Sequence, residues 1–392
     1  MTEQDMRNKL QELFDKNIPV YSYSKLTTWH ECKYNYYQNY ILHNKSRDNI
    51  YNKIGTVVHD GLENIYNHKG NLKDIQNNFK KQIQECEEMG IKFPENPPTT
   101  KINYLKNMEH FFNNYKIMKT EMKTEYFILY KIPRKENPKE DRDYIWIQMK
   151  IDSIIPVYNK DGNFESVIIN DWKTSSKFNK EKLIKAGKQL TIYKLGVEQA
   201  IGVNVSQIGW TMLKYVYCCY MTKGSKNNPP KVKKSMKDRK DSAKYFHKKI
   251  VNDFINDGMD TIEAELKAGR IINENNLNLL PQELQKKYWI EDCFLEYEYD
   301  NEIIKDCIQW IKDTVDEIEG IDQIEKNYPP VEIGDKTSYF CFNLCGRPNC
   351  IHLIKYKNEN KDKFKKEKKE KSINDLFNDK QKVKMNLDSL FK

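Results

Sequence analysis

Three residues of this chain carry side chains that together could cleave a phosphodiester bond: Asp152, Asp171 and Lys173. Carboxylate oxygens are preferred ligands of hard divalent cations such as Mg²⁺ and Mn²⁺. A lysine beside such a cation can orient the attacking water and offset the charge of the phosphate. Alone, an Asp-x-Lys triplet is a weak signal, because a chain with 57 acidic and 66 basic residues produces such triplets by chance.

The hydrophobic pattern around these residues predicts the elements that position them. An alternating run ends at Asp152, the segment Asn-Lys-Asp-Gly at 159–162 is a turn signal, and a second apolar run leads to Asp171. A hairpin of this kind brings the two carboxylates to the same end of a sheet. Lys173 points to the same face as Asp171, since strand side chains repeat every two residues.

A histidine on a predicted upstream helix is a further candidate. In the segment that begins at Gly55, His59 and Glu63 are one turn apart on one helix face. A neutral imidazole is a good metal ligand. The alternative interpretation is a surface histidine paired with an acid, which by itself is the more common arrangement.

Taken in order along the chain, these elements resemble the RecB-like branch of the PD-(D/E)XK nuclease superfamily. That branch includes the nuclease domains of bacterial recombination helicase-nucleases and the small CRISPR-adaptation exonucleases. Its pattern is a Ser-x-Ser-x-Leu opening with a nearby Cys, a Gly-x-x-x-His helix, a Glu-led strand, an Asp, an (Asp/Glu)-x-Lys and a Gln-x-x-x-Tyr helix. The matching positions are Ser22 to Cys32, Gly55 to His59, Glu125, Asp152, Asp171 with Lys173, and Gln189 with Tyr193.

The resemblance implies an α/β fold, a restriction-endonuclease-like core in which helices flank a central mixed sheet. We expect one nuclease domain over residues 1–354, with its catalytic core at about 120–220 and a Cys-rich metal-binding segment near its end. The elements that the pattern predicts are mainly helices at 2–120, strands within 125–171, a helix at 179–201, a strand at 205–220, and helices near 241–268 and 300–319.

The resemblance also implies roles for the residues that match. His59, Asp152 and Asp171 would hold Mg²⁺ or Mn²⁺, and the backbone carbonyl of Trp172 would be a further oxygen ligand. Lys173 would act on the attacking water or on the phosphate.

Three other matching residues are implied near the metal. Glu125 would be a further acid, and Gln189 and Tyr193 would face the site from the helix after the catalytic strand. For Tyr193, ordinary helix packing is the alternative. Lys150 departs from the family pattern, which often has a glycine just before the first acid, but the departure removes no ligand.

Nine cysteines and a polar N-terminus without a signal-peptide pattern predict an intracellular chain without a disulfide framework. Cys341, Cys345 and Cys350 are three thiols within ten residues, a density typical of metal ligation. In the iron–sulfur members of the family an early cysteine, here Cys32, joins three late ones around a [4Fe–4S] cluster. The late spacing here is C-x₃-C-x₄-C instead of C-x₂-C-x₅-C, so zinc with Cys32 or His352 as fourth ligand is the competing interpretation.

Positive charge is concentrated in two segments. Residues 221–250 contain 11 Lys or Arg and two Asp, and residues 355–392 contain 13 Lys and seven acids. With Gly224 and two prolines, the first segment is predicted to be a basic loop that contacts phosphates. The alternative is a solvated lysine surface encoded by an AT-rich genome. The candidate DNA-binding residues are Lys231, Lys233, Lys234, Lys237, Arg239 and Lys240.

The segment from Lys355 onward is of low complexity and is predicted to be disordered. Near its end, Leu387, Leu390 and Phe391 form an apolar group that suits docking to a partner. The peptide resembles the C-terminal Leu-Asp-x-Leu-Phe peptides by which T-even-like phage replication proteins hold their sliding clamp. A frayed amphipathic end is the alternative.

These patterns together predict a Mg²⁺- or Mn²⁺-dependent DNA exonuclease that acts on single strands or ends in replication, recombination or repair. Two alternatives stay open: a structure-specific or restriction-type endonuclease on the same fold, and a non-catalytic iron–sulfur DNA-binding module. The chain lacks a Walker-type loop, so a helicase would be a separate partner. Its apolar runs are too short to span a membrane, and a cytoplasmic location is expected, in the host if a phage encodes it.

Overall fold

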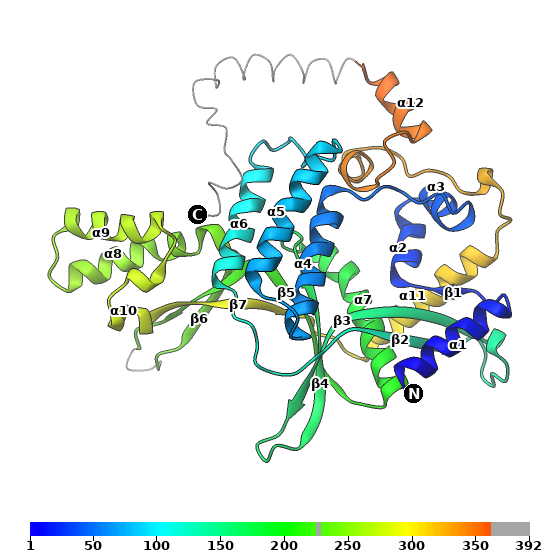
Figure 1. Ribbon diagram of the computed structural model, residues 1–392, viewed down its shortest axis with the longest axis horizontal. Helices are drawn as coiled ribbons and strands as arrows, with labels where there is room; N and C mark the ends of the chain where they lie inside the picture. The colour runs from blue at the N-terminus through cyan, green and yellow to red at the C-terminus, as the bar shows by residue number, and fades with distance from the viewer. Residues whose placement is uncertain (225–228, 362–392) are drawn as a thin grey trace.

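A seven-stranded mixed sheet forms the centre of the protein in the computed structural model, which describes residues 1–224 and 229–361 (Figure 1). The strand order is β1-β3-β4-β5-β6, with β2 paired to β3 and β7 paired to β5. β4 and β5 run parallel, whereas β3 and β4 form an antiparallel hairpin. The strands are β1 Val20–Tyr21, β2 Lys123–Pro133, β3 Tyr144–Tyr158, β4 Phe164–Lys173, β5 Val205–Met221, β6 Val232–Asp238 and β7 Tyr288–Glu296.

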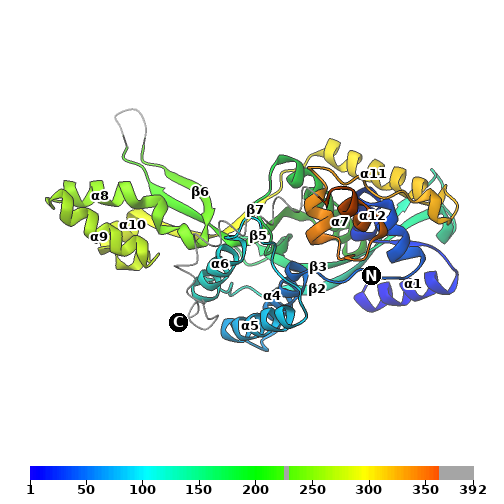
Figure 2. The same cartoon turned by 90° about the horizontal axis from the view of Figure 1, so that it is seen from above.

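Helices cover both faces of this sheet (Figures 1 and 2). On one face, the core formed by α4, α5 and α6 includes Val58, Phe79 and Phe111 and reaches Trp172 on β4. On the other face, α1, α7 and α11 bury a second core against β2 and β3. The predicted α/β class with a central mixed sheet flanked by helices is therefore confirmed. The helices of these layers are α1 Glu3–Asp15, α4 Ile50–Tyr66, α5 Leu72–Glu88, α6 Thr100–Asn114, α7 Lys180–Ile201 and α11 Asn301–Glu319.

Local sequence signals fix the elements that carry the site. The β3–β4 turn is closed by Gly162, whose φ of 80° lies in the left-handed region that favours glycine. The helix α7 begins after Asn179, whose side chain accepts a hydrogen bond from the backbone N–H of Lys182. It ends at Gly202, another left-handed residue.

A small helical lobe projects from one end of the sheet, between β6 and β7 (Figures 1 and 2). It has its own core, which includes Phe246, Ile250 and Phe254. The predicted basic loop is only partly a loop: residues 232–238 are the strand β6, which pairs antiparallel with the end of β5. The lobe contains α8 His247–Asn256, α9 Thr261–Asn273 and α10 Gln282–Lys287.

The C-terminal part of the described chain returns to the N-terminal helices α2 Tyr23–Glu31 and α3 Lys33–Tyr36. The helix α12 runs over Ile351–Glu359, so the first residues of the segment expected to be disordered are helical. The proposed docking residues Leu387, Leu390 and Phe391 lie outside the described residues. None of the described helices is long and apolar enough to cross a membrane.

Candidate active site

Three elements bring the predicted catalytic residues together. Asp152 lies on β3, Asp171 and Lys173 lie on β4, and His59 lies on α4. His59 Nδ1 is 3.2 Å from Asp152 Oδ2, and Lys173 Nζ is 2.6 Å from Asp171 Oδ2. The backbone N–H of Trp172 donates a 2.8 Å hydrogen bond to Asp152 Oδ2, which fixes that carboxylate. The register of the hairpin therefore places both acids side by side, with Asp152 in contact with the histidine of α4.

A divalent cation fits this cluster by the chemistry of its donors. Ligand atoms of His59, Glu125 and Asp152 lie within 4.8 Å of one another, which gives one nitrogen and two carboxylate oxygens. The Asp171 Oδ2 atom is buried and, among the described residues, has no partner in hydrogen-bond geometry, although Lys173 is ion-paired with it. A buried carboxylate oxygen without a hydrogen-bond donor is free to coordinate a metal ion, so Asp171 fits the role of a metal ligand.

Glu125 reaches the cluster through an irregularity in β2. Its φ of 52° is left-handed, which is uncommon for a non-glycine residue and often marks a functional site. It lies opposite Asp152, between the paired residues Thr124 and Tyr126. Its carboxylate is ion-paired with Lys150, the residue that stands where the family often has glycine.

Burial and the charge of the nearest oppositely charged neighbour shift the pKa values of four groups in opposite directions. The groups are His59, Asp152, Asp171 and Lys173. Burial raises the pKa of Asp171 to about 6, against the opposing effect of Lys173. Burial would also raise the pKa of Asp152, but the charges of His59 and Lys173 outweigh it, so the pKa is lowered. For His59 and Lys173 burial would lower the pKa, but the neighbouring carboxylates outweigh it and raise both values.

Two residues of α7 approach the cluster from the other side. Tyr193 is buried, and Gln189 Nε2 donates a 2.7 Å hydrogen bond to its hydroxyl. Burial raises the pKa of Tyr193 far above its usual range, and the charges of Asp171 and Asp152 raise it further. The Tyr193 hydroxyl is therefore close enough to Asp171 and Asp152 for their charges to affect it, while its ring packs in the core.

The side chain of Trp172 has a positioning role that the sequence did not reveal. It is fully buried, meets the His59 ring edge-on at 6.1 Å and stacks on Tyr66 at 5.8 Å between ring centroids. A large rigid ring beside the imidazole restricts where His59 can lie. The proposed role of the Trp172 carbonyl as a metal ligand stays a prediction.

A cleft of about 560 Å³ opens beside His59 and Lys173. It is rich in tyrosine and contains two further lysines, none of which the sequence motifs predicted. One signal was present: Lys214 interrupts an otherwise apolar strand pattern. The residues that line the cleft away from the catalytic cluster include Tyr51, Tyr104, Lys182, Lys214, Tyr215 and Tyr339.

The predicted DNA-binding residues lie just before, on and after β6, and they differ in exposure. Lys231 and Lys233 are exposed, whereas Lys234 Nζ is 2.5 Å from Glu291. Lys237 Nζ lies over the Tyr245 ring. Lys240 is half-buried and ion-paired with its neighbour Asp241.

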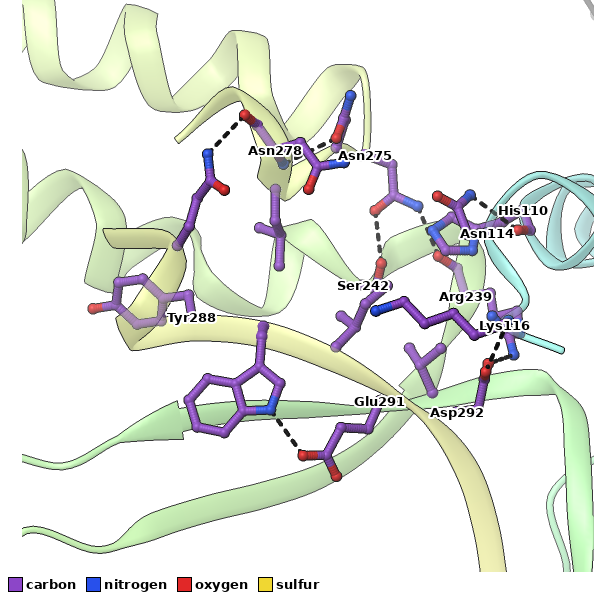
Figure 3. A pocket seen from close by; sticks show the side chains of 16 residues that line it. His110, Asn114, Lys116, Arg239, Ser242, Asn275, Asn278, Tyr288, Glu291 and Asp292 are labelled. Atoms are coloured by element: carbon purple, nitrogen blue, oxygen red, sulfur yellow. Dashed lines mark hydrogen bonds and ion pairs between the residues drawn. The ribbon is translucent and has the colours of Figure 1, made fainter. Parts of the chain in front are cut away.

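Arg239 corrects the expectation for this segment. Its side chain is only 1% exposed, Nε donates to the Leu213 carbonyl at 2.7 Å, and the guanidinium is ion-paired with Asp292. It lines a second cavity of about 400 Å³ between α6, β7 and the lobe (Figure 3). Arg239 is thus engaged inside the fold, because a buried guanidinium needs such partners.

Four cysteines line one further cavity. Cys32 lies between α2 and α3, Cys341 lies in a short helical turn, Cys345 ends that turn, and Cys350 precedes α12. Burial raises the pKa of the Cys345 thiol to about 12, and the other three thiols add to this effect. Within the part of the chain that the structure describes, no three of these sulfurs lie mutually within 4.8 Å. His352 lines the same cavity.

Comparison with known families gives one result. The family model described as the PD-(D/E)XK nuclease superfamily matches residues 20–322, which includes both catalytic strands, α4, α7 and the inserted lobe. No curated protein sequence matches the chain.

Proposed function

The chain belongs to the PD-(D/E)XK nuclease superfamily, and from this premise we propose that it is a RecB-like DNA exonuclease acting on single strands or ends. The single observation that carries the catalytic part is the convergence of His59, Asp152, Asp171 and Lys173 from three separate elements. The biological setting that we propose is replication, recombination or repair.

The residues of the cluster divide the work of hydrolysis. His59, Glu125, Asp152 and Asp171 would hold Mg²⁺ or Mn²⁺, which when bound supplies Lewis-acid stabilisation of the phosphate and a more acidic water. Lys173 is held in place by Asp171 and stays protonated, so it can orient the water or neutralise the phosphate.

The walls of the cleft support a preference for unpaired DNA. Tyr51 and Tyr339, which are partly exposed, line the same cavity as Lys173, whereas Tyr104 and Tyr215 line it as buried residues. Aromatic side chains stack on unpaired bases regardless of sequence, which suits an enzyme that processes strands of any sequence. Duplex DNA presents its bases to such a wall only where the strands separate, as they do at an end.

End-labelled single- and double-stranded DNA, incubated with the protein with and without Mn²⁺, tests this function. We expect Mn²⁺-dependent release of short products from ends, faster on single strands. Closed circular single-stranded DNA is the control for internal cleavage. Cutting of the circle at the rate of the linear strand would favour the endonuclease alternative. No cleavage with either metal would favour the non-catalytic module.

We also propose that Cys32, Cys341, Cys345 and Cys350 bind one [4Fe–4S] cluster. The four thiols line one cavity although Cys32 is far from the others in sequence. A single tetrahedral zinc, with Zn–S bonds of 2.3 Å, draws its sulfurs to within about 4 Å of one another. Among the described residues no three of the four sulfurs are grouped that closely, so the competing zinc site would require them to move together.

Anaerobic purification distinguishes these metals. A [4Fe–4S] cluster would make the protein brown, with absorbance near ~400 nm and about four irons per chain. Colourless protein with stoichiometric zinc would assign the site to zinc, and protein with neither metal would remove the proposal.

A further inference from the structure

The charges of the catalytic cleft are unbalanced. Three lysines and one carboxylate, Asp238, line it, and Lys173 is ion-paired with Asp171. Lys182, exposed at the rim, and Lys214, only 8% exposed, make no ion pair with a carboxylate within residues 1–224 and 229–361. The Lys214 ammonium lies 4.6 Å from the centroid of the Tyr104 ring, and Asp238, which lines the same cleft, acts on its charge without forming an ion pair.

A buried lysine of this kind is costly unless something supplies the counter-charge. Burial lowers the pKa of Lys214 to about 8, and Asp238 offsets that effect only in part. Lys194 gives the contrast: it is equally buried, but it is ion-paired with Glu198 one helical turn away. The fold therefore gives the buried lysine on α7 an ion-paired acid, whereas Lys214 has only the more distant charge of Asp238, which lines the same cleft.

We propose that Lys214 binds the phosphate next to the scissile one, with Lys182 contributing at the rim, and so sets the position of the strand in the cleft. Lys214 is then a positioning residue for a single-stranded polynucleotide. This inference rests on the proposed nuclease function, which it deepens by naming how the substrate backbone is held.

The sheet register supports this spacing. Lys173 on β4 is paired with Met212 on the parallel strand β5, and Lys214 follows two residues later. Strand rise and strand separation put the Cα atoms of the two lysines about 8 Å apart. That separation is comparable with the distance between consecutive phosphates of an extended strand. The pairing of β5 with β7 is irregular between Thr211 and Val216, so the place of Lys214 rests on its contacts: it lines the same cleft as Lys173 and lies against Tyr104.

A charge-neutralisation series tests the inference. Single-stranded oligonucleotides carry one methylphosphonate, an uncharged phosphate replacement, at each of the first five linkages from the end where cleavage starts. KM and kcat are measured with Mn²⁺, and Kd is measured by fluorescence anisotropy without divalent metal. The variants are Lys214→Met, Lys214→Arg as the charge-retaining form, and Lys194→Met as the matched loss of a buried but paired lysine.

For the wild type, we expect a methylphosphonate at one linkage next to the cleaved one to raise KM and Kd by about 10- to 100-fold. This is the size of effect expected for the loss of one charge-assisted contact. Lys214→Met should show the same loss on the all-phosphate strand and no further loss with that methylphosphonate. Lys214→Arg should recover most of the affinity, kcat should change less than KM, and Lys194→Met should keep the wild-type pattern.

The inference would be overturned if the methylphosphonate weakened binding to Lys214→Met by the same factor as it weakens binding to the wild type. The two changes would then act independently. The inference would also be overturned if the wild-type KM and Kd did not change with a methylphosphonate at either linkage next to the cleaved one. This wild-type measurement decides the question if Lys214→Met does not fold. A wild type that binds the strand but cleaves no DNA would refute the nuclease function alone, because the coupling with Lys214 is then still measured by Kd.

Discussion

The catalytic cluster and the cysteine cluster both join residues that are far apart in the chain, but they are built differently. His59, Asp152 and Asp171 stand on a long helix and on central strands, and their partners are other protein groups. Cys341, Cys345 and Cys350 belong to short turns and helix ends and are partly exposed.

This difference predicts what each cluster depends on. Regular elements packed in two cores hold the catalytic side chains in place before any ligand arrives. The thiols lie on short turns, and a bound metal would add to the hydrogen bonds by which Arg347 holds this segment against Asn35 and Asn39. Losing a catalytic residue should therefore cost activity, whereas losing a thiolate should cost structure.

The largest expected effect is on the catalytic side of this comparison. Lys173→Ala should slow DNA cleavage by at least ~10²-fold, because it removes the cation that is paired with Asp171. Strand binding and thermal unfolding should change little. Lys185→Ala, which removes an ion-paired lysine of α7 outside the cluster, is the control. Cleavage at the wild-type rate by Lys173→Ala would mean that the site is misassigned.

A thiolate substitution tests the other side. Cys345→Ser should lower metal content and lower the unfolding temperature by at least about 5 °C, with faster proteolysis near residues 340–360, because the proposed metal would link that segment to Cys32. Cys86→Ala, at a buried thiol of α5 far from the cluster in sequence, should keep the metal. Equal metal content in both variants would show that Cys345 does not bind the metal, and the proposed dependence of the cysteine cluster on a metal would be wrong.

Acid stability should depend on a third region, the junction between α6 and the lobe. Burial and then the charge of Arg239 lower the pKa of His110 to about 4. Above pH 6.5 this histidine is neutral in both states. Between pH 6.5 and 4 only the unfolded chain takes up the proton, so the free energy of unfolding falls by up to about 3 kcal/mol and levels off below pH 4.

His110→Gln should remove that part of the acid loss, measured as urea unfolding at pH 7, 5.5 and 4.5. The substitution keeps a polar side chain and takes away the titrating group. An unchanged difference between pH 7 and 4.5 would assign the acid sensitivity to other groups, including the two clusters.

The smallest effect is expected on β6. The double change Lys231→Glu and Lys233→Glu should weaken binding to all DNA sequences alike and flatten the slope of log K against log salt by about two units. Both lysines are exposed, unlike Arg239. Lys160→Glu, on the distant β3–β4 turn, is the control and should leave the slope as it is. A slope unaffected by the double change would make β6 a solvated edge.

From the sequence alone the α/β class and the hairpin of β3 and β4 could be predicted, together with the proposed catalytic residues on that hairpin. This was possible because a period of two residues, a glycine turn and the order of several motifs are local properties of the chain. The helix α7 was equally predictable, since its capping residues Asn179 and Gly202 are written at its ends.

Only the tertiary structure decided which charges are free to act. Arg239 and Lys214 are both basic residues of strand-rich segments, yet one is paired with Asp292 and the other faces the cleft with an aromatic ring beside it. The gathering of Cys32 with the late cysteines is likewise a contact across about 300 residues. Burial and counter-charge arise from residues distant in sequence, so a local pattern can mark Lys214 as unusual in its strand but cannot say which groups surround it.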